Sequence, residues 1–407
     1  MSKPHIITAL DIGSNSIKLI SAFKKSKTGN FDVAGQAQDS SAGIRKGVVV
    51  DVNKASETIA CLAKNVEEES KHKIKGVYVN IDGGHISCNC SRGLVSVSRA
   101  DRKISEEDVD RVVQAAKTFS LPSNKEIIDT FPKEFIVDGQ GGVKEPVGME
   151  GVRLEAEVLM LHCFSPYLKN SSRAVLNAGL QINDLIPGPL ASAQAVLTPR
   201  EKELGVMLLD IGGGTTGMTI FEEECLVDFA IFPVGSSHIT NDIAICLKTD
   251  IDTAEKIKLE FGKYSPKSSG SKASRKKVKL EGEEPLIFSP KTLNDIIEAR
   301  VCEILNLINK ELKKVSRQGL LPAGVVLTGG GANLPGIKEL AKKELKLPCR
   351  IGLPVRFPSL SEDPSFSAIC GLIMAGSELE EEDGGGFSSF GSGAARGFKR
   401  FLKIFIP

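Results

Sequence analysis

A short turn motif occurs twice in this chain, and the repeat limits the possible folds more than any other feature. Asp11-Ile12-Gly13-Ser14-Asn15 returns as Asp210-Ile211-Gly212-Gly213-Gly214-Thr215-Thr216. Each copy lies between an apolar run short enough for a buried strand and a β-rich stretch, so each is expected on a hairpin. Thr328-Gly329-Gly330-Gly331 follows a third apolar run. One such turn alone would indicate only a hairpin, whereas two copies and a third glycine run predict one nucleotide held from two sides.

The residue types in these turns suit phosphate and magnesium. Glycines let the backbone adopt positive φ angles and bring its N–H groups close to phosphate oxygens. Hydroxyl donors stand beside them at Ser14, Thr215 and Thr216. Asp11 and Asp210 come at the strand ends, where direct contact with phosphate would be repulsive, so we expect them to hold Mg²⁺ through its water shell.

Length and charge narrow the classes of function. A chain of 407 residues exceeds one ordinary core, so two or more domains are expected. Subtracting 51 acidic from 52 basic residues leaves a net charge of +1, and with no Trp and three Tyr there is little to attract or stack nucleic acid. The first residues lack the apolar core of a signal peptide, and no run reaches the roughly 18 apolar residues of a membrane span. We expect a protein that binds no nucleic acid and is neither exported nor membrane-spanning.

Periodicity predicts helices around the turns. Asp51 is placed to cap a helix over Val52 to Glu69, and Ser105 to cap another. Further helices are expected at Ser165 to Ala178, Pro189 to Leu197, Ser236 to Leu247, Asp252 to Phe261 and Leu293 to Lys314. Asp82-Gly83-Gly84 imitates the phosphate turns, but the α+β pattern that follows it indicates a chain crossing into a separate unit.

Two Asp-Gly hairpins, a connecting helix and a late TGGG strand resemble the actin-like ATPase fold, an α/β fold of two lobes with a nucleotide cleft. A more specific likeness comes from the second turn and from four short segments. These segments are Pro146 to Glu155 (PVGMEGVRLE), Phe232 to Gly235 (FPVG), Ala254 to Lys258 (AEKIK) and Ile297 to Arg300 (IEAR). They resemble the bacterial cell-division FtsA family from about Ile6 to Ala375 and again at the end of the chain. That family adds an extra α+β subdomain and a C-terminal amphipathic helix to the actin-like fold.

The resemblance implies an ordered series of segments. They are lobe I (1–82), the inserted α+β subdomain (83–163), the rest of lobe I with its connecting helix (164–198), the lobe II core (199–240), the small subdomain of lobe II (241–317) with a basic insertion (262–284), the lobe II return with the final lobe I helix (318–376), a flexible linker (377–393) and a membrane-binding amphipathic helix (394–407). The basic insertion is interpreted as a mobile surface segment, with a specific docking site as the alternative.

By the same resemblance the ligand is ATP with Mg²⁺. The matching residues are Gly13, Ser14, Asn15 and Lys18 in the first phosphate turn, Gly212, Gly213, Gly214 and Thr215 in the second, and Gly329, Gly330 and Gly331 in the adenosine turn. Glu255 and Lys258 would contact ribose and adenine, unless they are an ordinary surface ion pair. Gln194 lies near the position of actin's water-orienting glutamine and is the candidate catalytic residue. The family does not generally keep a glutamine there, so we expect slow hydrolysis at most.

The last residues have a basic amphipathic pattern. One helical face carries Phe398, Phe401, Leu402 and Phe405, and most of the remainder carries Arg396, Lys399, Arg400 and Lys403. Each basic residue near anionic lipid contributes about 1 kcal/mol, so the pattern predicts binding in the membrane interface. The alternative is a helix that packs on its own protein body, which would need no linker.

The resemblance predicts an ATP-binding adaptor that tethers the tubulin-like protein FtsZ to the cytoplasmic face of the membrane at the division site and helps assemble the septum. It implies a peripheral protein that also polymerises head to tail. Arg300 matches the family's arginine that meets the C-terminal tail of FtsZ; the alternative is an ordinary helix arginine paired with Asp295 or Glu303. Two rival interpretations of the same fold are a PilM-like platform for pilus assembly and a sugar-kinase-like enzyme with a carboxylate base in its cleft.

Overall fold

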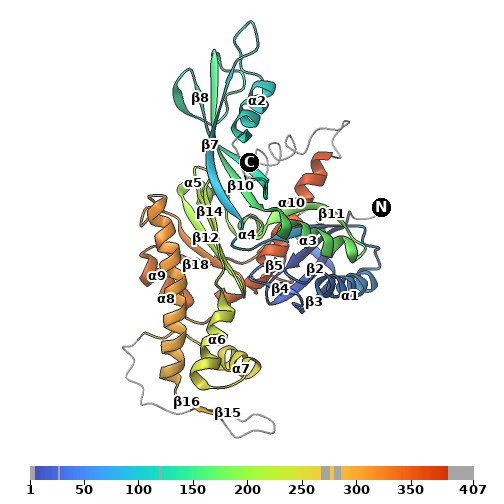
Figure 1. Ribbon diagram of the computed structural model, residues 1–407, viewed down its shortest axis with the longest axis vertical. Helices are drawn as coiled ribbons and strands as arrows, with labels where there is room; N and C mark the ends of the chain where they lie inside the picture. Colours follow the sequence, from blue (N-terminus) through green and yellow to red (C-terminus); the bar gives the residue numbers. More distant parts are fainter. Residues whose placement is uncertain (1–4, 26–27, 119–121, 267–275, 279–285, 384–407) are drawn as a thin grey trace.

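The two lobes lie on either side of the paired turns. The computed structural model describes residues 5–25, 28–118, 122–266, 276–278 and 286–383. Figure 1 shows a further unit built on β7, β8 and α2 at one end of the long axis, and helices α6 and α7 at the other. The predicted terminal helix, 394–407, lies outside the described residues.

Lobe I is built on a mixed sheet whose central hairpin carries the first turn. Its strands, in spatial order, are β11 (Gln181–Pro187), β6 (Gly76–Ile81), β1 (Ile7–Ile12), β2 (Ser16–Lys24) and β3 (Phe31–Ser40). β1 pairs antiparallel with β2 and parallel with β6, so it lies inside the sheet. Every residue of β1 is buried, as expected for a strand covered by helices on both faces. A short hairpin, β4 (Ile44–Arg45) with β5 (Val48–Val49), follows β3.

Alternation along β1 divides the apolar side chains of lobe I between two cores. Leu10 and Ile12 join the core under α1 (Val52–Ser70) and α3 (Ser165–Asn177). Ile7 and Ala9 join the core that contains residues of α4 (Gly188–Val196) and α10 (Ser367–Asp383). Two helical layers therefore fix the position of the turn that follows β1. The local cap of α1 is the predicted one, because the Asp51 carboxylate accepts the Lys54 N–H at 3.2 Å.

Lobe II repeats this arrangement around the second turn. Its strands, in spatial order, are β14 (Cys225–Phe232), β13 (Thr216–Glu222), β12 (Val206–Ile211), β17 (Gly324–Thr328) and β18 (Cys349–Ile351). The helices that follow or flank them are α5 (Pro199–Leu204), α6 (Ser236–Leu247), α7 (Ile251–Phe261), α8 (Pro290–Lys314) and α9 (Ile337–Leu345). One apolar core joins β12 and β13 to α6, α7, α8 and α9. The predicted hairpins are confirmed at both turns, since β12 also pairs antiparallel with the strand after its turn.

The inserted unit has its own sheet and its own core. Its strands, in spatial order, are β7 (Ser87–Ser96), β10 (Arg153–Phe164), β8 (Lys125–Val137) and β9 (Gln140–Val143). Helix α2 (Glu106–Lys117) covers the sheet and begins with a capping box between Ser105 and Asp108. A separate apolar cluster joins α2 to β8 and β10. The chain leaves lobe I at Gly83, whose φ of 115° is in the region that favours glycine.

Two segments differ from what the sequence predicted. α10 continues to Asp383, with Ser377 buried, so the flexible linker predicted from Ser377 begins too early. The basic insertion is described only in part: Tyr264 is buried, and Lys276–Val278 (β15) pairs with Leu286–Phe288 (β16).

Two short 3₁₀ helices, η1 (Gly330–Asn333) and η2 (Pro364–Phe366), lie in contact beside the TGGG strand. None of the helices in the described part of the chain is both long and apolar enough to cross a membrane.

Candidate nucleotide site

The two turns are built alike. The Gly13 N–H donates to the Ser16 carbonyl at 3.1 Å, and the Gly212 N–H donates to the Thr215 carbonyl at 2.9 Å. The first residues of α6 hold the second turn, because the N–H groups of Ser236 and Ser237 donate to the carbonyls of Gly212 and Gly213, each at 2.9 Å. The sequence repeat is therefore also a repeat of backbone structure.

The turns face one another across the cleft at close range. A Cβ added at Gly213 would lie 2.9 Å from the Asn15 Cβ, and one at Gly214 would lie 2.6 Å from the Ser14 Oγ. Such distances are shorter than carbon and oxygen atoms tolerate, so only glycine allows this approach. Among the described residues, the N–H groups of Ser14, Asn15, Gly213 and Gly214 have no hydrogen-bond partner. Successive free N–H groups in a turn form an anion-binding concavity.

A cavity of about 310 Å³ opens beside the turns, within the usual range for small-molecule sites. Its polar lining comes from both turns and from Asp11, Lys18, Asp82 and Asp210. The lining also includes the glycines of the TGGG segment and apolar side chains of α7, α8 and α9: Leu259, Val301, Ile304, Leu305 and Ile337. Polar groups for phosphates and apolar side chains for a base are the two environments that a nucleotide requires.

Lys18 and Asp11 form a buried pair on the first hairpin. They are opposite one another in the β1–β2 register, and the Lys18 Nζ lies 3.7 Å from the Asp11 Oδ2. The ammonium also donates to the Ser365 carbonyl of η2 and lies 5.1 Å from the centre of the Phe366 ring. Burial raises the pKa of Asp11, and the charge of Lys18 opposes that shift. Lys18 is thus held in the lining of the cavity as a point charge.

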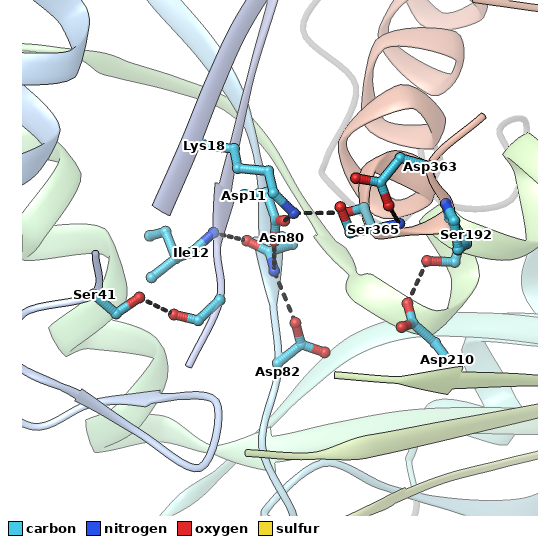
Figure 2. Close-up of polar contacts among 12 residues, drawn as sticks. Asp11, Ile12, Lys18, Ser41, Asn80, Asp82, Ser192, Asp210, Asp363 and Ser365 are labelled. Carbon is cyan, nitrogen blue, oxygen red and sulfur yellow. Dashed lines mark hydrogen bonds and ion pairs between the residues drawn. The ribbon is translucent and has the colours of Figure 1, made fainter. Parts of the chain in front are cut away.

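Asp210 ends the second of the paired strands. Its carboxylate accepts a hydrogen bond from the Ser192 hydroxyl of α4, and Figure 2 shows it facing the cluster around Asp11. Burial raises the pKa of Asp210 to about 6, with the Ser192 hydrogen bond lowering it and the charge of Asp11 raising it. The two motif carboxylates therefore come from opposite lobes and meet in one site.

Asp82 is a third carboxylate in the site, although its DGG segment was interpreted only as a chain crossing. Asn80 Nδ2 donates to the Asp82 Oδ2 at 2.7 Å and to the Asp11 Oδ1 at 2.8 Å (Figure 2). Burial raises the pKa of Asp82 well above its usual value, and the charges of Asp11 and Asp210 raise it further. Asp82 directly follows β6, which is the parallel neighbour of β1. Because the ends of parallel strands meet at one edge of a sheet, this position could have predicted that Asp82 lies near Asp11.

Glu255 and Lys258 line the cavity on α7. The Lys258 Nζ lies 2.8 Å from the Glu255 Oε2 and donates to the Thr240 hydroxyl at 2.9 Å, and the same hydroxyl donates to Glu255. The Lys258 side chain is 10% exposed and that of Glu255 is 36% exposed. The ion pair given as the alternative is therefore present, and both of its residues also line the cavity.

Three predicted site residues lie elsewhere. Thr216 is fully buried and donates to the Val234 carbonyl at 2.8 Å, so its hydroxyl binds the protein backbone. Gly214 contacts the opposite turn and does not line the cavity. Gln194 also stays outside the lining and donates to both carboxylate oxygens of Glu378, at 3.0 and 3.1 Å. Its predicted catalytic role has no support in this geometry. Lining residues that the sequence did not single out include Ser16, Gln38, Gly47, Pro189, Ser236, Ser237 and Asn333.

The donor set fits a nucleotide that carries Mg²⁺. Turn N–H groups and Lys18 supply positive partners for phosphates, and carboxylates stand beside them at the strand ends. In the described part of the chain no group of three or more His, Cys, Asp or Glu side chains converges as direct metal ligands. Mg²⁺ usually keeps several waters when it binds with phosphates, so carboxylates that reach it through water are suitable partners.

The chain matches known proteins along most of its length. A family described as "Cell division protein FtsA" matches residues 207–371, and one described as "SHS2 domain inserted in FTSA" matches residues 83–162. The cell division protein FtsA of Pseudomonas aeruginosa is 34% identical over 390 residues, covering 95% of this chain and 93% of that protein. The chain belongs to the FtsA family of cell-division proteins. Its Bacillus subtilis relative is 34% identical over 375 residues, 92% of this chain and 84% of that protein. The Escherichia coli K12 relative is 32% identical over 383 residues, 92% and 90% of the two chains.

Solved structures confirm the actin-like fold. A chain of a PilM–PilN type IV pilus biogenesis complex superimposes with a TM-score of 0.63 at 18% identity, covering 91% of this chain and 98% of the other. MreB5 of Spiroplasma citri bound to ADP gives a TM-score of 0.57 at 13% identity, covering 94% and 99%. At such identities the likeness shows the fold alone, and the PilM match does not favour a pilus function for an FtsA-family chain.

Arg300, the residue predicted to meet a partner, lies on α8 and is already paired within lobe II. Its Nε and Nη2 donate to the two carboxylate oxygens of Asp242 on α6, at 2.6 and 2.8 Å, and Nη1 donates to Glu303. The predicted alternative partner Glu303 is confirmed, whereas Asp242, 58 residues away in the chain, was not anticipated. The Arg300 side chain remains 22% exposed, so another molecule can reach it.

Proposed function

We propose that this protein is an ATP-binding, actin-like adaptor that tethers FtsZ to the cytoplasmic face of the membrane at the division site. It acts by binding, with ATP hydrolysis slow at most. The membrane tether is inferred from the terminal sequence. As a helix, this sequence would place Phe398, Phe401, Leu402 and Phe405 on one face and basic residues on most of the remaining surface. Together with family membership, that pattern favours a peripheral membrane protein over an enzyme of the sugar-kinase type.

The nucleotide lies along the cavity, with its phosphates between the two turns. The N–H groups of Ser14, Asn15 and Gly213 face the phosphate oxygens, and Lys18 contributes a point charge. Mg²⁺, when bound, neutralises phosphate charge; Asp11 and Asp210 hold its water shell. The base and ribose lie against Gly329, Gly330 and Gly331, beside Glu255 and Lys258. Because the contacts come from both lobes, the nucleotide links the lobes in a closed arrangement.

The terminal segment binds the lipid surface, and lobe II binds FtsZ. Four basic residues near anionic lipid contribute roughly 4 kcal/mol in addition to partial burial of the aromatic face. Its lipid-binding residues are Phe398, Lys399, Arg400, Phe401, Leu402, Lys403 and Phe405. Arg300 exchanges its internal carboxylates for those of the FtsZ tail, since a guanidinium suits bidentate carboxylate contacts. Head-to-tail contacts between copies of the chain extend the tether along the membrane.

Flotation with lipid vesicles tests this proposal. The purified chain is mixed with anionic vesicles and FtsZ, with and without Mg-ATP, and compared with a chain that ends at residue 393. The proposal predicts that FtsZ floats only with the complete chain, while the shortened chain stays soluble and still binds ATP. Flotation of FtsZ with the shortened chain would contradict the anchor, and a complete chain that floats without recruiting FtsZ would contradict the adaptor role.

A further inference from the structure

Asn80 and Asp82 form a polar pair beside the first phosphate turn that neither glycine turn supplies. Asn80 uses its whole side-chain amide there. Its Oδ1 accepts the Ile12 N–H at 2.6 Å, and its Nδ2 donates to Asp11 at 2.8 Å and to Asp82 at 2.7 Å. One side chain at the end of β6 therefore fixes two carboxylates of the site relative to β1, as Figure 2 shows.

The start of α4 fixes Asp82 from the other side. A Cβ at Gly188 would lie 2.7 Å from both carboxylate oxygens of Asp82, so the carboxylate lies against bare backbone. This is the N-terminal end of α4, where the helix dipole favours a negative charge. Asn80 occupies the Asp82 Oδ2, and the Asp82 Oδ1 has no hydrogen-bond partner among the described residues. Asp82 lines the cavity, so that oxygen is available to a group bound there.

Charge in this part of the cavity is unbalanced. Asp11 and Asp82 come from lobe I and Asp210 from lobe II, and the charges of Asp11 and Asp210 act on Asp82. Lys18 is the cation within ion-pair distance of Asp11. When all three carboxyl groups are ionised, they exceed the one ammonium by two negative charges where the phosphates of a nucleotide would add more. A bound divalent cation supplies the missing charge.

We propose that Asp82 makes nucleotide binding depend on metal: it accepts a hydrogen bond from the water shell of the Mg²⁺ that accompanies the nucleotide, and without metal it repels the phosphates. This inference rests on the proposed nucleotide binding. Contact through water agrees with the lack of converging direct metal ligands in the described residues. Since Asp82 and Asp210 belong to different lobes, the same charges oppose closure of the metal-free cleft.

The test compares ATP binding with and without Mg²⁺ in the full chain. Dissociation constants are measured by calorimetry with excess Mg²⁺ and with excess EDTA, for the parent, Asp82→Asn and Asp82→Ser. The control is Asp228→Asn, which removes another buried carboxylate, on β14, that contacts Cys88 and does not line the cavity. We expect metal-free ATP to bind more tightly to both Asp82 variants and Mg-ATP slightly less tightly. The ratio of the dissociation constant in EDTA to that in Mg²⁺ should fall by on the order of tenfold in both Asp82 variants. Asp228→Asn should keep the parental ratio.

Thermal unfolding without ligand separates this role from a purely structural one. Removing a carboxylate that repels its neighbours should leave the ligand-free variants at least as stable as the parent. A parental ratio of constants in both Asp82 variants would overturn the inference, as would a loss of stability with no change in that ratio. If the parent itself bound no ATP in the presence of Mg²⁺, the proposed nucleotide binding would fail instead.

Discussion

The ion pair between Arg300 and Asp242 predicts that an internal carboxylate competes with the FtsZ tail. Asp242→Asn removes the charge of the internal partner and leaves a side chain of the same shape. The pair is bidentate, with N–O distances of 2.6 and 2.8 Å, and both side chains are about a quarter exposed, at 22% and 24%. A bidentate pair that is partly exposed to water is worth about 1 kcal/mol. A tail carboxylate that displaces Asp242 loses that amount, so Asp242→Asn should strengthen tail binding by up to about fivefold.

Two matched variants are expected to change the affinity for the FtsZ tail in opposite directions. Arg300→Gln should weaken tail binding by roughly tenfold, because it removes the guanidinium that receives the tail. Arg300→Glu is a poorer test, since it would place a third carboxylate beside Asp242 and Glu303 and disturb the packing of α6 on α8. The assay is fluorescence anisotropy with a labelled peptide of the FtsZ C-terminal tail, at low and at physiological salt. If Asp242→Asn weakened binding, the competition would be refuted; if Arg300→Gln bound like the parent, Arg300 would not be the site.

Two further predictions concern the membrane segment and pH. Phe401→Glu places a charge in the apolar face and should abolish flotation with any vesicle, whereas Arg400→Glu should reduce flotation with anionic vesicles much more than with neutral ones; equal losses on both vesicle types would contradict the electrostatic contribution. Because the folded-state pKa of Asp210 is raised from 3.8 to about 6, the folded protein binds this proton more tightly than the unfolded chain, and ligand-free stability should fall as pH rises through that interval. The unfolding temperature, measured between roughly pH 4 and pH 8, should fall less with rising pH in Asp210→Asn than in the parent. An equal fall in both proteins would contradict a raised pKa at Asp210.

Elements with a strong local signal were predictable from the sequence. Residues 236–247 were expected as a helix and form α6 with those bounds, because the Pro233-Val234-Gly235 segment that precedes the helix is a local signal. The two hairpins followed from glycine turns between apolar runs, and the structure adds that both turns close with the same backbone hydrogen bond. The cavity between the turns followed from the repeat itself, since two phosphate turns in one chain imply that they face one ligand.

Features that depend on distant partners were not predictable. Gln194 meets Glu378, which lies 184 residues later, so α10 takes the amide that was expected to orient water. The same contact explains why α10 extends beyond Ser377: an acidic stretch typical of a linker is held by Gln194 and by Tyr78, whose hydroxyl donates to Glu380 at 3.1 Å. Asp82 was overlooked because a DGG segment before a new domain has the same local pattern whether or not its carboxylate faces a ligand. Only the pairing of β6 with β1 places it in the site.

Calorimetric titration of Mg-ATP tests most directly the central claim that the two turns hold one nucleotide between them. The parent should bind one equivalent of Mg-ATP. Gly213→Val puts a branched side chain where even a Cβ would lie 2.9 Å from the Asn15 Cβ, and Asp210→Ala removes an acceptor for the magnesium water shell, so both variants should bind much more weakly. Gly141→Ala is the control, because a Cβ there meets nothing closer than 3.4 Å and the residue lies in the inserted unit. Parental affinity in both Gly213→Val and Asp210→Ala would contradict the site.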